Sequence, residues 1–303
     1  MTSTSWPAVR PPGPRHLRPM PDVPGVTHHF GRTQGATFHV AEAGSGDPVV
    51  LLHDVAQHWY AWHRLIPELA SRYQLFCIDL RGCGWSEGTR TGYDTEAQSR
   101  DVLAVMAALG LERAHLIGHG SGGWIGFRLC LMAPERFGAF LALNTTHPWP
   151  ARTALVRHAW RFWYTAFWEY PVAGRVVLRR WPAFTRMLLR RWAGRSYEWD
   201  LATLDEFVRA STGRATARAV QQTLWQFVLR DIPGLVFGGQ RGRPLTVPTL
   251  LLGGEVDPVA RLDPAQDLSR HADALEIEML PGGHLLPETA PKLVAAAARD
   301  LFG

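Results

Sequence analysis

The sequence is poor in cysteine and lacks long uninterrupted apolar runs. Its only cysteines are Cys77, Cys83 and Cys130, an odd number in a chain without a secretory apolar segment, so we expect free thiols and a reducing, cytoplasmic location. The apolar stretches are short or broken by arginine, which argues against a membrane-spanning helix. No Cys/His cluster has metal-ligand spacing and no Gly-rich phosphate loop occurs, so we expect no metal and no cofactor.

Basic residues exceed acidic ones by a small margin. The 32 Lys and Arg against 27 Asp and Glu give a net charge of +5, carried mostly by arginine. Several arginines cluster between Arg175 and Arg195, where they alternate with Trp, Leu and Met at helical spacing. This pattern is typical of the solvated face of an amphipathic helix. Because no nucleic-acid motif accompanies the charge, we expect no nucleic-acid partner.

The first half of the 303-residue chain alternates strand and helix patterns after a proline-rich start. Residues 1–27 contain seven prolines and predict an extended arm. Short apolar or alternating runs predict strands at Thr37–Glu42, Val49–Leu52, Gln74–Ile78, Ala114–Ile117 and Phe140–Asn144. Helical spacing predicts helices at Trp59–Arg72, Ala97–Leu109 and Trp124–Ala133. Such alternation indicates a doubly wound, mostly parallel sheet.

The alternation breaks between residues 149 and 239, which are helical in pattern and rich in Trp, Arg and Leu. Strand signals return at Thr249–Leu252 and Leu275–Leu280, before a terminal helix at Pro291–Leu301. We therefore expect an α/β core made of residues 28–148 and 240–303, with a helical cap at 149–239 inserted between them. The cap aromatics would close over a small apolar organic substrate and exclude water; they are Trp160, Phe162, Trp163, Phe167 and Trp168.

Four motifs occur in order, each after a predicted strand. They are Leu51-Leu52-His53-Asp54; Asp79-Leu80-Arg81-Gly82-Cys83-Gly84-Trp85-Ser86; Leu116-Ile117-Gly118-His119-Gly120-Ser121-Gly122-Gly123; and Leu251-Leu252-Gly253-Gly254-Glu255-Val256-Asp257 with Pro281-Gly282-Gly283-His284. With them the sequence, from about residue 25 to 303, resembles the α/β-hydrolase superfamily, and most closely the bacterial epoxide hydrolases with their haloalkane dehalogenase relatives. The resemblance implies the α/β-hydrolase fold.

Glycine stands where the family has its nucleophile. In the family, the turn after the strand ending at Ile117 carries the nucleophile between small residues, here Gly118 and Gly122, which puts Gly120 at the centre. Glycine accepts the strained backbone of such a turn, but it has no side chain to attack a substrate. The covalent alkyl-enzyme ester of the epoxide hydrolases therefore cannot form at residue 120.

The other two catalytic positions of the family are occupied. Asp257 follows a buried strand, where the family's acid stands, and His284 lies in the Gly-Gly-His loop that carries the family's base. The resemblance implies that Asp257 orients the imidazole and stabilises its protonated form. The other ring nitrogen would then activate water or take a substrate proton.

Two loops near the same site depart from the family pattern. Where the family has His-Gly-x-Pro, the chain has His53-Asp54-Val55-Ala56. The resemblance implies that the backbone N–H groups of Val55 and Ser121 form an oxyanion hole, and Ser121 stands where relatives commonly have Trp. We expect His53 and Asp54 to line the substrate site.

A further departure falls in the cap. Trp225 stands where relatives usually carry a tyrosine that protonates the opening epoxide. Three other tyrosines, Tyr164, Tyr170 and Tyr197, are candidate cap donors, and ordinary amphipathic packing is the alternative for each. We expect Trp225 and Tyr164 to contact the substrate.

Three functions fit these residues. In the first, His284 with Asp257 performs non-covalent acid/base chemistry on an apolar molecule of the natural-product type, in a hydration, elimination, lyase or cyclisation reaction. In the second, Ser121 acts as a displaced nucleophile, although bulky His119 then fills a position that should be small. In the third, the protein binds a ligand or partner on a hydrolase scaffold without turnover.

Two points stay open at the level of sequence. Asp54 appears where the family has Gly, while a carboxylate is missing at residue 120. Asp54 could act as a base or repel anionic substrates, but we favour a solvated or ion-paired loop carboxylate. A homo-oligomer is compatible with the sequence.

Overall fold

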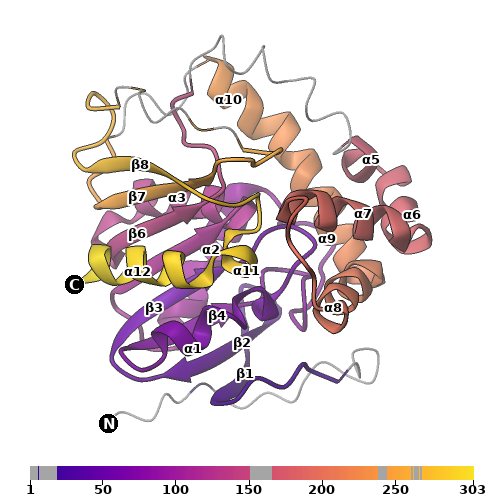
Figure 1. Cartoon of the computed structure of the whole chain (residues 1–303), viewed down its shortest axis with the longest axis horizontal. Helices are drawn as coiled ribbons and strands as arrows, with labels where there is room; N and C mark the ends of the chain where they lie inside the picture. Colours follow the sequence, from indigo (N-terminus) through magenta and orange to yellow (C-terminus); the bar gives the residue numbers. More distant parts are fainter. Residues whose placement is uncertain are drawn as a thin grey trace.

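The computed structural model describes residues 6, 19–150, 166–237, 244–260, 262, 266 and 268–303, and its centre is one eight-stranded sheet (Figure 1). The strand order is β1-β2-β4-β3-β5-β6-β7-β8. Pairing is antiparallel for β1 with β2 and β2 with β4, and parallel for all other neighbours. The strands are β1 (Val26–Thr33), β2 (Ala36–Gly44), β3 (Asp47–Leu52), β4 (Tyr73–Ile78), β5 (Ala114–His119), β6 (Phe137–Leu143), β7 (Thr249–Gly254) and β8 (Leu275–Leu280). The predicted mostly parallel sheet is confirmed.

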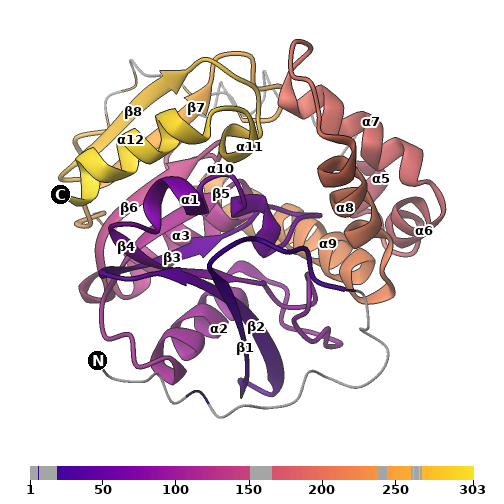
Figure 2. The same ribbon diagram turned by 60° about the horizontal axis from the view of Figure 1, so that its bottom comes forward.

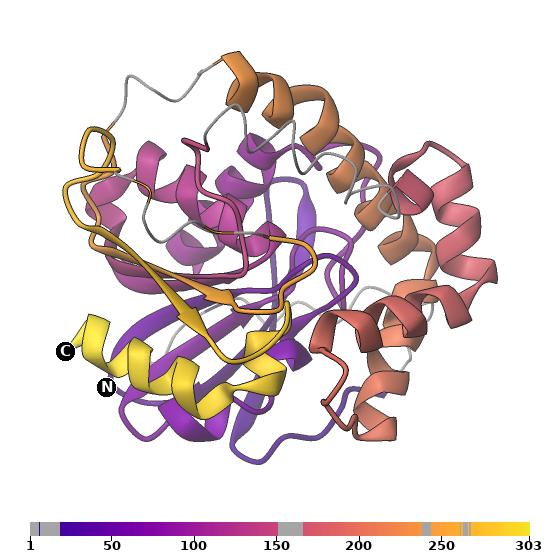
Figure 3. The same ribbon diagram turned by 45° about the horizontal axis from the view of Figure 1, so that its top comes forward.

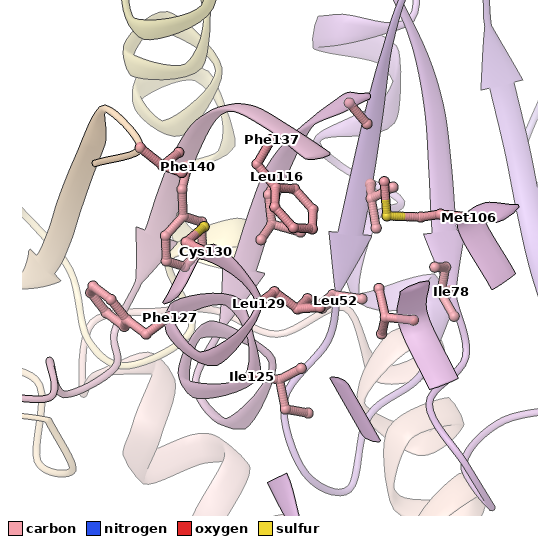
Figure 4. Close-up of a cluster of buried hydrophobic side chains, with 14 of the residues drawn as sticks. Leu52, Ile78, Met106, Leu116, Ile125, Phe127, Leu129, Cys130, Phe137 and Phe140 are labelled. Carbon is pink, nitrogen blue, oxygen red and sulfur yellow. The ribbon is translucent and has the colours of Figure 1, made fainter. Parts of the chain in front are cut away.

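Helices cover both faces of the sheet, as the fully apolar central strands require. In β3, Val50 and Leu52 pack with α2 (Thr95–Ala108) and α3 (Ser121–Met132), and Figure 4 shows this side of the core. The alternate residues Val49 and Leu51 pack on the other face with α1 (Ile66–Leu69) and α12 (Pro291–Phe302). Because successive strand side chains point to opposite faces, one short apolar run supplies two cores.

Two predicted elements differ from the structure. The single helix expected at Trp59–Arg72 is instead a short 3-10 helix, η2 (Trp59–Trp62), followed by the one-turn helix α1. Pro67 stands in the first turn of α1; its missing N–H and its ring prevent a helix from running through it from the N-terminal side. In addition, β1 starts at Val26, within the last residues of the expected arm.

A group of helices, which we call the cap, lies between β6 and β7 in the chain and beside the sheet in Figures 2 and 3. Its helices are α5 (Ala166–Glu169), α6 (Ala173–Arg180), α7 (Pro182–Ala193), α8 (Leu201–Thr212), α9 (Arg214–Gln226), η5 (Phe227–Asp231) and α10 (Ile232–Phe237). The predicted amphipathic pattern is confirmed, because Arg179, Arg180, Arg190 and Arg191 are exposed while Leu188 is buried.

The cap aromatics fall into two groups. Trp168 is buried against Phe184 and Trp192 of α7, whereas Phe167 is exposed. Trp160, Phe162, Trp163 and Tyr164 lie outside the described residues. Their predicted position over a substrate stays a prediction.

The thiols and the helix lengths agree with the sequence. Cys77, Cys83 and Cys130 are free and buried, and burial raises the pKa of each thiol above its ordinary value. Within the described ranges, no helix combines the length and apolar character needed to cross a membrane.

A glycine at the start of α3 allows the helix to lie directly against β3. A Cβ on Gly122 would meet the backbone oxygen of Leu52 at 2.1 Å, so Gly122→Ala should cost on the order of 3 kcal/mol of stability and lower the melting temperature by several degrees. Gly234 of α10 is the matched control, since a Cβ there meets nothing within 4 Å. Thermal unfolding of both variants checks this, and equal melting temperatures would contradict it.

Candidate functional site

The register of two neighbouring strands brings the site together. In the parallel pair β3 and β5, Leu52 lies opposite Gly118. Asp54 and Gly120 each follow these partners by two residues. Because the carboxyl ends of parallel strands meet at one edge of the sheet, the two positions become neighbours.

Gly120 forms a tight strand-to-helix turn between β5 and α3. Its backbone angles are φ 52° and ψ −115°, a conformation that residues other than glycine rarely adopt. Gly118 is small for a steric reason, because a Cβ there would lie 2.6 Å from the backbone oxygen of Gly122. The turn thus has the geometry that the sequence motif predicted.

The carboxylate of Asp54 occupies the space in front of Gly120. A Cβ built on Gly120 would lie 2.1 Å from the Asp54 carboxyl carbon, and 2.2 and 2.5 Å from its two oxygens. Asp54 is buried, with 4% of its surface exposed, and its Oδ1 accepts a hydrogen bond of 2.7 Å from the backbone N–H of Ser121. The expectation of a solvated loop carboxylate is wrong; the ion-paired alternative is confirmed by the contact with His284.

His284 lies between two carboxylates. Its Nδ1 is 2.9 Å from Asp257 Oδ2, and its Nε2 is 3.1 Å from Asp54 Oδ2. Asp257 is fixed in turn, since its Oδ1 accepts hydrogen bonds from the backbone N–H groups of Val259 and Ala260, and its Oδ2 accepts one of 2.8 Å from Asn144. The predicted contact between His284 and Asp257 is present.

The two carboxylates set the protonation of the site. Burial alone would lower the pKa of His284, but the charge and hydrogen bond of Asp257, and then those of Asp54, raise that pKa to about 10. Burial raises the pKa of Asp54, but the hydrogen bond with His284, together with the charges of His119 and His284 and the Ser121 N–H, brings that pKa below the ordinary value. The resting site therefore holds an imidazolium between two carboxylates.

His119 supports the same cluster from β5. Its Nε2 donates to the backbone oxygen of His284 at 2.7 Å, and Gln57 Oε1 lies 3.2 Å from its Nδ1. Burial lowers the pKa of His119 to about 4, so this imidazole is neutral near pH 7. His119 holds the backbone of the His284 loop.

Asp54, His119 and His284 also have ligand atoms within 4.8 Å of one another, a spacing that a metal ion could use. The geometry favours a proton instead, because Nε2 of His284 is within hydrogen-bond distance of Asp54 and the raised pKa of His284 keeps that hydrogen in place. A bound metal would have to displace it. We therefore expect dialysis against EDTA to leave the melting temperature unchanged, and a fall that is reversed by a divalent ion would contradict this.

The imidazolium should make stability depend on alkaline pH. The folded pKa of His284 is about 10, above the ordinary histidine value of 6.5, so its stabilising effect is complete below pH 6.5 and is lost as pH rises toward 10. The stability advantage of the natural protein over His284→Gln should shrink across this range by more than about 1.4 kcal/mol, the equivalent of one pKa unit. Urea unfolding of both proteins from pH 6 to pH 10 measures this, and a constant difference would refute it.

The cap contacts the His284 loop directly. The backbone oxygen of Trp192, at the end of α7, accepts a hydrogen bond of 2.7 Å from the backbone N–H of His284, and the two rings lie 5.5 Å apart. Nearby, Tyr197 donates to Glu288 at 2.5 Å and accepts a hydrogen bond from Arg64. The cap therefore helps to hold the His284 loop in place through Trp192.

The remaining predicted site residues fall into two groups. Some hold the loop after β3 in place, and others make no described contact with the cluster of Asp54, His284 and Asp257. His53 has both ring nitrogens on backbone groups, Nδ1 at 2.8 Å from Asp54 O and Nε2 at 3.0 Å from Leu80 N, so it supports the loop. Val55 is half-buried against the cap, and its oxyanion role stays a prediction. The predicted Ser121 N–H donor is present, but it binds the Asp54 carboxylate.

Among the described residues, neither Trp225 nor a cap tyrosine can be assigned as the group that protonates the substrate. Trp225 of α9 is half-buried, with its ring 6.1 Å from that of exposed Tyr170. Tyr197 is bound to Glu288 and links the cap to α11 (Leu286–Thr289). Tyr164 lies outside the described residues.

The loop after β3 contains a left-handed residue where the family motif has proline. Ala56 has a φ of 60°, whereas proline fixes φ near −65°, so the proline expected in the family motif does not fit this conformation. In this loop the Asp54 side chain lies against Gly120.

Three functional contacts escaped the sequence analysis. His119 was considered only for its bulk, and Asn144 only as the end of a strand. The carbonyl contact of Trp192 has no side-chain signature. For Asn144 a signal existed, since a polar residue directly after a buried parallel strand lies at the edge where the site forms.

A doubly wound sheet, a strand-to-helix turn at its edge and a buried Asp–His pair after later strands define the class of α/β-hydrolase-fold proteins. The family model of the alpha/beta hydrolase fold matches residues 47–291, and the chain belongs to this family.

Its relatives include proteins named as an epoxide hydrolase and as a dehalogenase. The chain is 27% identical to the soluble epoxide hydrolase of Corynebacterium sp. strain C12, over 91% of this chain and 97% of that protein. It is 32% identical to a fluoroacetate dehalogenase of Burkholderia sp., over 45% of this chain and 46% of that protein. Among solved structures, Cfl2 of Burkholderia cenocepacia is similar, with a TM-score of 0.79, 25% identity and coverage of 92% and 96%.

Proposed function

We propose that the protein is an enzyme that adds water to a small apolar organic electrophile, with His284 as the group that moves protons. The observation that carries this proposal is the buried cluster in which His284 contacts both Asp257 and Asp54. A protein that only binds a ligand has no need for a histidine held between two buried carboxylates, which is costly to keep away from water.

The relatives suggest the substrate class. Their names are those of an epoxide hydrolase and a fluoroacetate dehalogenase, and both names describe the opening of a bond from carbon to oxygen or halogen. We carry this class to the present chain, with an apolar molecule of the natural-product type as the substrate. Of the reactions considered from the sequence, hydration fits best, because the names of the relatives indicate an electrophilic carbon and His284 can accept and donate the protons that the addition of water requires.

The test of this function is turnover of a panel of epoxides and uncharged haloalkanes by the natural protein, His284→Ala and Asp257→Asn. We expect His284→Ala to abolish turnover and Asp257→Asn to lower it by about 10⁴-fold, as for other Asp–His pairs. Melting temperatures control for folding. Equal turnover in natural protein and His284→Ala, or ligands that raise the melting temperature but are recovered unchanged by the natural protein, would contradict an enzymatic role.

The Ser121 alternative makes a different demand on geometry. A serine nucleophile needs the free imidazole nitrogen as its base, and in the described residues that nitrogen of His284 contacts Asp54. Ser121 uses its backbone N–H toward the same carboxylate. A fluorophosphonate adduct on Ser121, identified by peptide mass spectrometry, would restore this alternative.

A further inference from the structure

We propose that Asp54 is the nucleophile of this enzyme, a carboxylate transposed from the turn at residue 120 to the end of the neighbouring strand. Its Oδ2 would attack an sp3 carbon that carries a leaving oxygen or halogen and form an alkyl ester on Asp54. This inference rests on the proposed function and adds to it a covalent step.

The first supporting observation is the position of the carboxyl carbon. An aspartate at residue 120 would place its carboxyl carbon about 1.5 Å beyond its Cβ. The Asp54 carboxyl carbon lies 2.1 Å from the site where that Cβ would be. The carboxylate of Asp54 therefore fills nearly the volume that a side chain from residue 120 would fill, and the two cannot coexist.

The second observation is the orientation of the two oxygens. Oδ1 accepts the hydrogen bond of Ser121 N–H at the N-terminus of the twelve-residue helix α3, where the exposed N–H groups and the helix dipole favour a negative charge. Oδ2 points to Nε2 of His284 at 3.1 Å. A carboxylate oxygen has two lone-pair positions, so Oδ2 keeps one for attack.

The third observation is the cost of burying this carboxylate. Asp54 is 4% exposed, and its only side-chain partners in the described residues are Ser121 N–H and His284. A purely structural contact could be made by a neutral side chain at a lower desolvation cost. A buried, ionised and oriented carboxylate beside a histidine is what nucleophilic attack requires.

The reaction balances without any further reactant than water. In the first step an electron pair of Asp54 Oδ2 forms the C–O bond, and the pair of the broken bond leaves with halide, or with an epoxide oxygen that then takes a proton from water. In the second step His284 takes a proton from a water molecule, and the hydroxide adds to the carboxyl carbon of the ester. The Ser121 N–H is placed to stabilise the resulting oxyanion. Collapse expels the product alkoxide, which takes the proton of the Asp54 carboxyl group.

The ester also explains how a protonated histidine becomes a base. Asp54 is one of the two carboxylates that hold the proton on His284. Once Asp54 is an uncharged ester, that support is lost, the pKa of His284 falls, and the imidazolium releases its Nε2 proton to solvent and becomes a neutral imidazole. Asp257 still orients the ring through Nδ1. His284 therefore keeps Asp54 ionised before the first step, and it activates water after that step.

The test is trapping of the ester in His284→Gln, which lacks the base for the second step. This variant and the double variant His284→Gln/Asp54→Asn are incubated with styrene oxide or with 1-chlorohexane, one probe for each leaving group, and digested with trypsin. Asp54 falls in the peptide 33–64 and Ser121 in the peptide 114–128, so the two candidates separate. We expect one adduct per chain, on Asp54, with at least one probe, and none on that peptide in the double variant.

The outcomes separate this inference from the proposed function. Turnover by the natural protein with no Asp54 adduct in His284→Gln, or an adduct on Ser121, overturns the inference and leaves the function. Turnover of neither probe by a natural protein with its native melting temperature overturns both for these substrates. An adduct on Asp54 together with loss of turnover in His284→Gln supports both.

Discussion

Asp54→Asn should lower kcat by about 10⁴-fold or more while the protein stays folded. Asparagine keeps the shape of the side chain, and its carbonyl oxygen can still accept the Ser121 N–H. It is, however, a poor nucleophile, and it removes the charge that faces His284 at 3.1 Å. Loss of a single member of a catalytic Asp–His–nucleophile unit typically costs a factor of this size. Steady-state kinetics on the substrate found for the natural protein measure the effect.

Glu87→Gln is a matched control for this experiment. Glu87 also accepts a hydrogen bond from a backbone N–H, that of Thr37, outside the site. We expect its turnover to stay within about twofold of the natural protein, because Glu87 is half-buried away from the site and a glutamine in its place can still accept the Thr37 N–H. If Asp54→Asn kept a kcat within tenfold of the natural value, Asp54 would not be the reacting group.

Gly120→Asp should destabilise the protein strongly, and a second substitution should restore it. The new Cβ would fall 2.1 Å from the Asp54 carboxyl carbon and would bring a second carboxylate into the same volume. Overpacking together with repulsion between like charges should cost on the order of 3 kcal/mol or more. Asp54→Gly removes the obstructing side chain, so the double variant should be more stable than Gly120→Asp alone.

The double variant also carries a prediction about activity. It returns the carboxylate to residue 120, next to the same Ser121 N–H and His284, so some turnover should return relative to either single variant. Gly120→Ala is the matched control, since it keeps the clash without the second charge, and Asp54→Gly should relieve it as well. Additive destabilisation, with the double variant worse than both single variants, would show that the two positions do not share one volume.

The sequence predicts the sheet well because its signals are local. Short apolar runs such as Val49–Leu52 are buried on both faces wherever they occur in a parallel sheet, and Asp257 and His284 follow strands whose ends meet by topology. The helix predicted at Trp59–Arg72 is wrong because Pro67 can start a helix but cannot continue one, so helical spacing on both sides of it does not make a single helix.

The role of Asp54 could not be read from the sequence, because it depends on the loop path after β3. A carboxylate was missing at residue 120 and present at residue 54, but their meeting requires the pairing of Leu52 with Gly118 and the left-handed backbone of Ala56. Neither has a local sequence signal. The same holds for the carbonyl of Trp192, which reaches the His284 loop from the cap.

Single-turnover hydrolysis in water labelled with ¹⁸O, with enzyme in excess over substrate, tests the transposed nucleophile most directly. If Asp54 attacks the substrate, the oxygen added in the first turnover comes from the protein, so the product is unlabelled and ¹⁸O appears in the peptide 33–64 that contains Asp54. If His284 instead directs water onto the substrate, the first product carries ¹⁸O and that peptide stays unlabelled, which would contradict a covalent role for Asp54.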